Sequence, residues 1–191
     1  MPLLSPADIA GALHGVARVL RFDWTGLDYF ETSASGLLKS FWGPVVLLPL
    51  FLVTVAVSLM AGAILDPAPH PVRFVAIQLI AYVIDWVAFP LVILTLGDFL
   101  GFGGRAFHFL VPFNWFQIVA GLAIMTLDLG ARLGIVPTGL VLMIIAMTLI
   151  YTAVLARHGL RVPWWSVVGV TVLQLTISVF NHVFAYSLLT S

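Results

Sequence analysis

The chain has no cysteine, a single glutamate, a single lysine and few charges of either sign. Eight basic and eight acidic residues make up 8% of its 191 residues, whereas an ordinary soluble domain carries about 25%. The missing thiols exclude disulfides, thiolate metal sites and cysteine nucleophiles. Because the formal net charge is zero, the chain also lacks the basic surface that nucleic-acid binding needs, and we expect no nucleic-acid partner.

Apolar residues are what the sequence has in excess, at 62% of the chain. Such a surplus needs a solvent other than water, and the lipid bilayer accepts long uncharged segments. Five apolar stretches are each long enough to cross about 30 Å of hydrocarbon as a helix. They cover residues 41–65, 72–96, 110–128, 135–156 and 164–188. The sequence therefore predicts an all-α polytopic membrane protein with five transmembrane helices, and the lipid bilayer is its first expected partner.

The amino-terminal segment differs from the rest, which divides the chain into residues 1–40 and a transmembrane domain over 41–191. Ser5, Pro6 and Asp8 form a helix-start pattern of hydroxyl cap, proline and acid. Residues 6–21 then alternate apolar and polar positions at helical spacing, and the stretch is too short to span. The apolar positions are Ile9, Leu13, Val16 and Leu20. We expect an amphipathic helix lying at the membrane interface; the alternative is a flexible tail.

Short polar separators between the stretches predict loops at 66–71, 101–105, 129–132 and 157–161. The distribution of lysine and arginine over these loops indicates orientation, because cytoplasmic loops carry the excess. One side would carry Arg18, Arg21, Lys39, Arg105, Arg157 and Arg161, and the other Arg73 and Arg132. We therefore expect a cytoplasmic amino terminus and a carboxyl terminus on the opposite side of the cell inner membrane.

Asp85 lies near the middle of the second predicted span, where an ionisable group is costly unless it is paired or hydrated. Gln78 and Tyr82 share its helix face at three- and four-residue spacing. The fifth span carries a polar stripe of its own at the same spacing. Its members are Thr171, Gln174, Ser178 and Asn181. Two helical polar stripes predict that these spans pack together.

Depth along antiparallel spans predicts which side chains meet. Counting from the span ends places Asp85 level with Gln174 and places Gln78 level with Asn181. The resulting polar seam would either conduct protons or hold a small polar solute, with Asp85 as the titrating group. Alternatively it is a hydrogen-bonded clamp between helices. His182 near the end of the fifth span is interpreted as an interfacial residue.

The start of the third span adds Asn114 and Gln117, three residues apart on one face beneath this seam. Asp98, Arg105 and His108 flank the loop before them. These groups form either a vestibule to the seam or the solvated rim that a helical hairpin needs.

A shift of 96 residues places Asp85 on Asn181 and Gln78 on Gln174. Spans one and two would then correspond to spans four and five in the opposite orientation. Inverted repeats of this kind build many transporters, so the alignment suggests one here.

Catalytic motifs are missing. A zincin motif needs a glutamate between two histidines, and the one glutamate is Glu31. Asp85 and Asp98, thirteen residues apart, would stand about 20 Å apart on one helix and cannot act as an aspartyl protease pair. We therefore expect no enzyme, no catalytic or metal site and no cofactor.

Two segments carry a resemblance to a known family. The runs YVIDWVAFPL at 82–91 and PFNWFQ at 112–117 look like segments of bacterial members of the Yip family. From about residue 35 onward, the layout of a polar start and five closely spaced spans resembles that family. The resemblance implies a non-enzymatic multispanning protein of membrane organisation or transport. A homo-oligomer or a larger membrane complex would be its protein partner.

Overall fold

The computed structural model describes residues 4–60, 70–99 and 101–190, which form helices and no strands. The elements are α1 (Pro6–Val19), η1 (Trp24–Tyr29), α2 (Ala34–Ser40), α3 (Trp42–Met60), α4 (Pro71–Leu96), η2 (Gly103–Arg105), α5 (Ala106–Arg132), α6 (Thr138–Leu160) and α7 (Trp164–Thr190). Five segments are long and apolar enough to cross a membrane, namely α2 with α3, α4, α5 with η2, α6 and α7. The predicted all-α polytopic membrane fold is thus confirmed. The end of the first predicted span and most of the loop at 66–71 lie outside the described residues.

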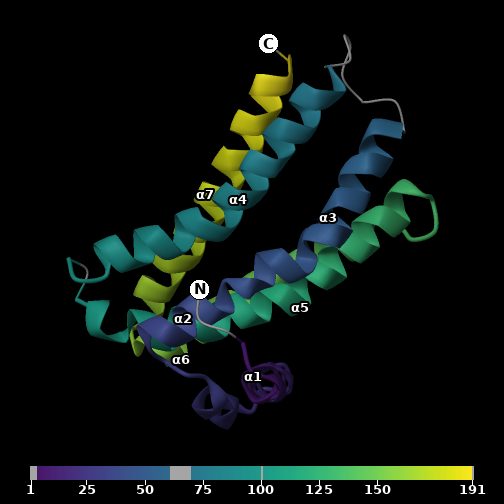
Figure 1. The fold of residues 1–191 in the computed structure, drawn as a ribbon. Helices are drawn as coiled ribbons and strands as arrows, with labels where there is room; N and C mark the ends of the chain where they lie inside the picture. Colours follow the sequence, from purple (N-terminus) through teal and green to yellow (C-terminus); the bar gives the residue numbers. More distant parts are fainter. Residues whose placement is uncertain (1–3, 61–69, 100, 191) are drawn as a thin grey trace.

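The long helices run up and down in a bundle (Figure 1). α4 and α7 lie side by side along their length, and α3 lies against α5. α6 packs on both α5 and α7. The three short amino-terminal elements gather where α3 begins, and we call this the α1 end of the bundle; the carboxyl terminus lies at the far end.

α5 is the centre of the bundle. It contacts α1, α2, α3 and α6, and it is the most buried of the five spans although its mean hydropathy is the lowest. A helix covered by protein does not need the apolar surface that lipid demands. Phe109 and Phe113 of α5 pack with Phe89 of α4 in the main core, close to the α1 end.

The amino-terminal helix forms as predicted but docks through another face. The Ser5 side chain accepts from the Asp8 main-chain N–H, and Asp8 accepts from the Ser5 main-chain N–H, which confirms the cap. The predicted apolar face is divided, because Ile9 and Leu13 are exposed whereas Val16 is buried against the protein. The buried face is Ala12, Gly15, Val16 and Val19. Its small side chains allow α1 to approach η1 and α5 closely, so this segment is a docked helix and not a flexible tail.

Two predicted boundaries are wrong: residues 129–132 and 157–160, expected in loops, end α5 and α6. Arginine is a good helix former and a single glycine costs only about 1 kcal/mol, so these residues do not stop a helix. The first long helix, α3, begins at Trp42, close to the predicted start at residue 41, and α2 extends the apolar segment back to Ala34. The first forty residues therefore contribute α2 to the membrane-spanning unit.

A close approach joins α5 to α6. Pro112 has no N–H, so the main-chain carbonyl of His108 lacks its usual helical donor. Gly159 of α6 lies against that carbonyl; a Cβ built on Gly159 would stand 2.7 Å from the His108 oxygen and 2.8 Å from the Phe109 Cα. Only glycine permits this contact without moving one of the two helices.

The substitution Gly159→Ala is expected to lower the free energy of unfolding by about 1–3 kcal/mol, because the added methyl group overpacks the helix contact. Gly139→Ala, on the same helix, is the matched control, since a Cβ there meets nothing within 4 Å. Thermal unfolding in detergent measures both. Equal stability of the two variants would contradict the close approach.

Candidate functional site

A polar contact joins α4 to α7 in the middle of the bundle. The Asn181 Nδ2 donates to Asp85 Oδ1 at 2.8 Å and to the main-chain carbonyl of Ala81 at 2.9 Å. Asn181 is 5% exposed, so an unpaired amide there would cost free energy. Both hydrogens of its amide are used, and both bonds reach the neighbouring helix.

His182 brings a second titratable group to this contact. Its Nε2 lies 3.8 Å from Asp85 Oδ2, and its Nδ1 lies 2.9 Å from the Ser178 main-chain carbonyl. A carbonyl only accepts, so Nδ1 carries the proton and Nε2 of the neutral ring is an acceptor. A direct bond between Nε2 and Asp85 therefore needs one further proton, on the carboxyl group or on the imidazole.

The observed pairing differs from the predicted layers. α4 and α7 are antiparallel as predicted, but Asp85 bonds to Asn181 and not to Gln174, and Asn181 does not use its donors on Gln78. A bond from Arg73 to the Leu188 carbonyl sets the same register. Asn181 lies seven residues, about two turns, beyond Gln174 on the same face of α7, so the predicted faces do meet but the partners meet at a different depth.

Gln174, the predicted partner of Asp85, lies on α7 toward the α1 end. Its Oε1 is buried, and no hydrogen bond within the described residues reaches it. Most buried polar atoms in proteins do have a partner. Gln174 therefore leaves one acceptor available beside the α4–α7 contact.

Tyr82 and Asn114 make contacts of their own. The Tyr82 hydroxyl donates to the Pro44 carbonyl at 2.7 Å, joining α4 to α3. Asn114, 1% exposed, donates to Ser40 Oγ at 2.9 Å, joining α5 to α2. Both bonds lead away from Asp85.

The predicted seam is therefore divided. Asp85 and Asn181 come together, whereas Tyr82 and Asn114 face α3 and α2. The other predicted members, Gln78, Gln117 and Ser178, are half-buried. What Tyr82, Asn114 and the Asp85–Asn181 pair have in common is that each connects two helices across an apolar bundle.

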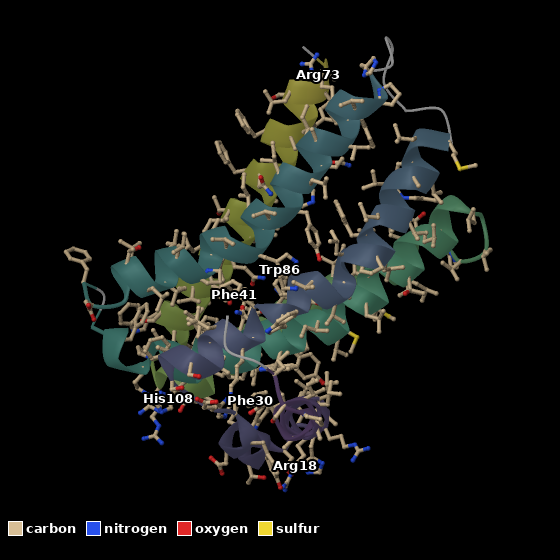
Figure 2. All side chains as sticks on the ribbon, viewed as in Figure 1. Arg18, Phe30, Phe41, Arg73, Trp86 and His108 are labelled. Atoms are coloured by element: carbon tan, nitrogen blue, oxygen red, sulfur yellow. The ribbon has the colours of Figure 1, made fainter. Side chains whose placement is uncertain are left out.

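A cavity of about 600 Å³ lies at the α1 end, and we call it the arginine pocket. Three arginines line it from two segments, Arg105 before α5 and Arg157 and Arg161 at the end of α6. His108, which Figure 2 labels at this end of the bundle, lines it as well. Of the predicted vestibule residues, Arg105 and His108 thus share a cavity, and Asp98 does not line it.

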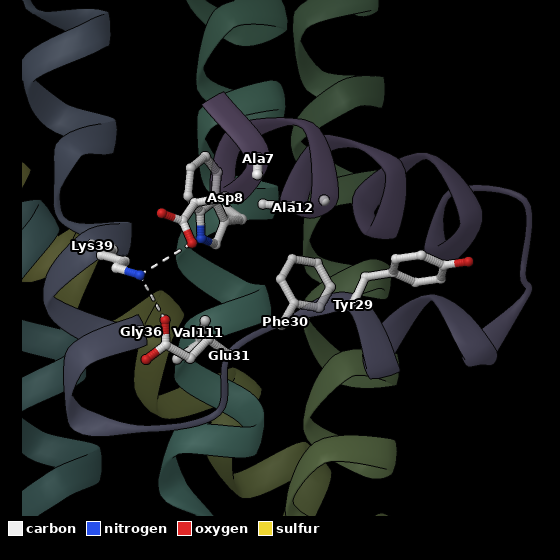
Figure 3. Close-up of a pocket in the computed structure, with 11 residues that line it drawn as sticks. Ala7, Asp8, Ala12, Tyr29, Phe30, Glu31, Gly36, Lys39 and Val111 are labelled. Atoms are coloured by element: carbon white, nitrogen blue, oxygen red, sulfur yellow. Dashed lines mark hydrogen bonds and ion pairs between the residues drawn. The ribbon is translucent and has the colours of Figure 1, made fainter. Parts of the chain in front are cut away.

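A smaller cavity, about 200 Å³, lies between α1 and α2 (Figure 3). Lys39 closes it through two ion pairs, 3.1 Å to Asp8 and 2.9 Å to Glu31. Its one lysine faces two acids, so its cation is fully paired within the protein. This cavity fastens the amino-terminal segment and has no unpaired cation for an anionic ligand.

The same contacts set the acidity of these carboxyl groups. Hydrogen bonds from the main chain and side chain of Ser5, followed by one from Lys39, lower the pKa of Asp8 to about 2. The Lys39 ammonium, followed by the Ser33 hydroxyl, lowers the pKa of Glu31. A lowered carboxyl pKa stabilises the docked segment above the ordinary value near 3.8, and this contribution is lost as pH falls through about 2.

The order of these causes gives a testable expectation. Ser5→Ala should raise the pKa of Asp8 only part of the way toward its ordinary value, because it removes the hydroxyl bond and keeps the main-chain N–H of residue 5, which is the largest cause of the lowered pKa. A carboxyl-carbon NMR titration of Asp8 in the variant and the wild type measures the shift. A return of the pKa to its full ordinary value near 3.8 would contradict the main-chain bond as the main cause.

Sequence reasoning missed several partners. Ser40 lay outside the predicted first span, and main-chain carbonyls such as those of Pro44 and Ala81 carry no signal in a sequence. His182 was interpreted as interfacial, although it follows Asn181 directly. Arg157 and Arg161 belong to the predicted loop at 157–161, and Arg105 belongs to the predicted loop at 101–105. The lysine and arginine count places both loops on the same side, and this was the signal in the sequence for their shared cavity.

Comparison with known proteins adds no relative, since no family model, curated protein or solved structure matches the chain.

Proposed function

We propose that this chain is a non-enzymatic integral membrane protein that acts in membrane organisation or as an accessory subunit of a larger membrane complex. The observation that carries the proposal is that the side-chain amides within its spans form hydrogen bonds to neighbouring helices. Asn181 and Asn114 both donate to neighbouring helices, and Asn181 holds the carboxyl group of Asp85. Polar side chains used in this way define a fixed arrangement of helices and favour the clamp over a conducting seam.

The orientation and the membrane are part of the proposal. With six of eight lysines and arginines on one side by the count above, the α1 end would face the cytoplasm and the carboxyl terminus the opposite side of the cell inner membrane. The resemblance to the Yip family agrees with such a role. Its partners would be the lipid bilayer and either further copies of the chain or other subunits.

A double-mutant cycle tests the clamp. Asp85→Asn weakens the bond, and Asn181→Asp places two carboxyl groups in contact; each single variant should unfold at a lower temperature. The double variant exchanges amide and carboxylate and should recover part of the loss. We expect a coupling free energy of about 0.6–1.7 kcal/mol, the range of measured hydrogen bonds between membrane helices.

Ser187→Ala is the control on the same helix, because the Ser187 hydroxyl bonds only to the Phe184 carbonyl of α7 itself among the described residues. It should leave the unfolding temperature unchanged. Additive effects in the cycle, with no recovery in the double variant, would contradict the clamp.

A second candidate function is a proton-linked carrier of a small polar solute, centred on Asp85. Two observations favour it: Nε2 of His182 lies 3.8 Å from the Asp85 carboxyl group, and Gln174 Oε1 is buried with no hydrogen-bond partner among the described residues. Together they place two titratable groups at the α4–α7 contact and a buried acceptor further along α7.

Proton flux separates the two candidates. The protein reconstituted in vesicles with an internal pH-sensitive dye would be exposed to a pH gradient, alongside the Asp85→Asn variant. Flux that is present in the wild type and lost in a variant of unchanged thermal stability would favour the carrier. The structural proposal predicts no flux above empty vesicles in either protein.

A further inference from the structure

The arginine pocket concentrates positive charge that the protein does not neutralise. Arg105, Arg157 and Arg161 line it together with His108 and His158, and Asp28 is the one acid among its lining residues. Within the described residues, none of the three arginines lies at ion-pair distance from a carboxylate. This contrasts with the Lys39 cavity, where the one cation is paired with two carboxylates.

Neutral groups hold two of these arginines in place. Arg105 Nε donates to the Gly159 carbonyl at 3.0 Å, and Arg157 Nη1 donates to the Val162 carbonyl at 2.8 Å. The Arg157 guanidinium also lies 5.9 Å from the centre of the Trp164 ring. Carbonyls and a ring face orient a guanidinium without cancelling its charge, so further donors remain for an anion.

Arg161 occupies a backbone conformation that favours glycine on steric grounds. It ends α6 with a φ of 55°, in the left-handed region. Helices commonly end with glycine in that conformation, because a Cβ is disfavoured there. The chain instead places a cation at this position on the rim of the pocket.

The pocket lies where membrane spans end. Its walls come from η1 and Thr32 on one side and from η2, the start of α5, the end of α6 and the start of α7 on the other. Trp164 and Trp165, both exposed, begin α7 beside it, and indole rings are typical of the headgroup level of a bilayer. Basic pockets between spans at this level suit the phosphate of an anionic lipid, and about 600 Å³ is within the range of small-molecule sites.

We propose that the arginine pocket binds the phosphate headgroup of an anionic phospholipid, with Arg161 as a direct ligand. The assignment rests on the proposed function only in taking the α1 end to lie at a membrane surface; it does not depend on the Asp85 contact. Guanidinium groups bind phosphate oxygens through two parallel hydrogen bonds. Phosphatidylcholine carries the same phosphate group, but its quaternary ammonium would be repelled by the three arginines of the pocket, so the site favours a headgroup with net negative charge.

Lipid binding in neutral detergent tests the site. The purified full chain is titrated with short-chain phosphatidylglycerol, phosphatidylcholine or glycerol 3-phosphate, and bound ligand is counted by native mass spectrometry. Phosphatidylglycerol should be retained at one site, phosphatidylcholine should not, and glycerol 3-phosphate should bind more weakly than the lipid. Arg161→Gly should weaken phosphatidylglycerol binding by roughly tenfold, as expected for one charge-assisted contact.

The glycine variant separates binding from folding, because it removes a charge and at the same time relieves the backbone. Its thermal stability without lipid should equal or exceed that of the wild type. Arg21→Gln is the matched control, an exposed arginine at the same end that does not line the pocket, and it should bind as the wild type does. Unchanged binding in Arg161→Gly, or equal loss in both variants, would overturn the site; glycerol 3-phosphate binding as tightly as the lipid would overturn the lipid assignment while leaving the proposed function standing.

Discussion

An amide inside a hydrocarbon layer must find its hydrogen-bond partners within the protein, and this requirement decides how α4 meets α7. Asn181 reaches Asp85 and the Ala81 carbonyl with the two hydrogens of its side chain. Apolar contacts alone discriminate poorly between different registers of two apolar helices, because lipid tails are as apolar as leucine side chains. The polar contact therefore selects one register out of several that packing would tolerate.

The two ends of the bundle differ in how they are held. At the α1 end, small residues bring segments into backbone contact: Gly15 meets Gly26 between α1 and η1, and Gly159 meets the His108 carbonyl between α6 and α5. The far end has a small apolar cluster built on Val55, Phe74 and Leu189. The α1 end also contains both cavities described above. Close backbone packing and clustered charged side chains therefore occur together where the amino-terminal helix docks.

The sequence predicts the spans well because hydropathy over twenty residues is a strong signal, and Ser5 and Asp8 predict the start of α1 for an equally local reason. Partners were harder to predict. Depth was counted from span ends, and the error there moved the partner of Asn181 from Gln78 to Asp85, seven residues along the same face of α4. The docked face of α1 depends on glycine contacts with η1, which no periodicity in α1 contains. The 96-residue shift aligns the same two residues, Asp85 and Asn181, and the inverted repeat that it suggests stays a prediction.

The most direct test of the account is a distance measured in a bilayer. The chain has two asparagines, and Asn114 bonds to a serine, so labelling asparagine side chains with nitrogen-15 and aspartate carboxyl groups with carbon-13 isolates the Asn181–Asp85 contact for solid-state NMR. We expect a dipolar coupling between the Asn181 side-chain nitrogen and the Asp85 carboxyl carbon, of the strength that a direct hydrogen bond between these groups gives. The substitution Asn181→Leu should abolish it. A wild-type spectrum without that coupling would contradict the account.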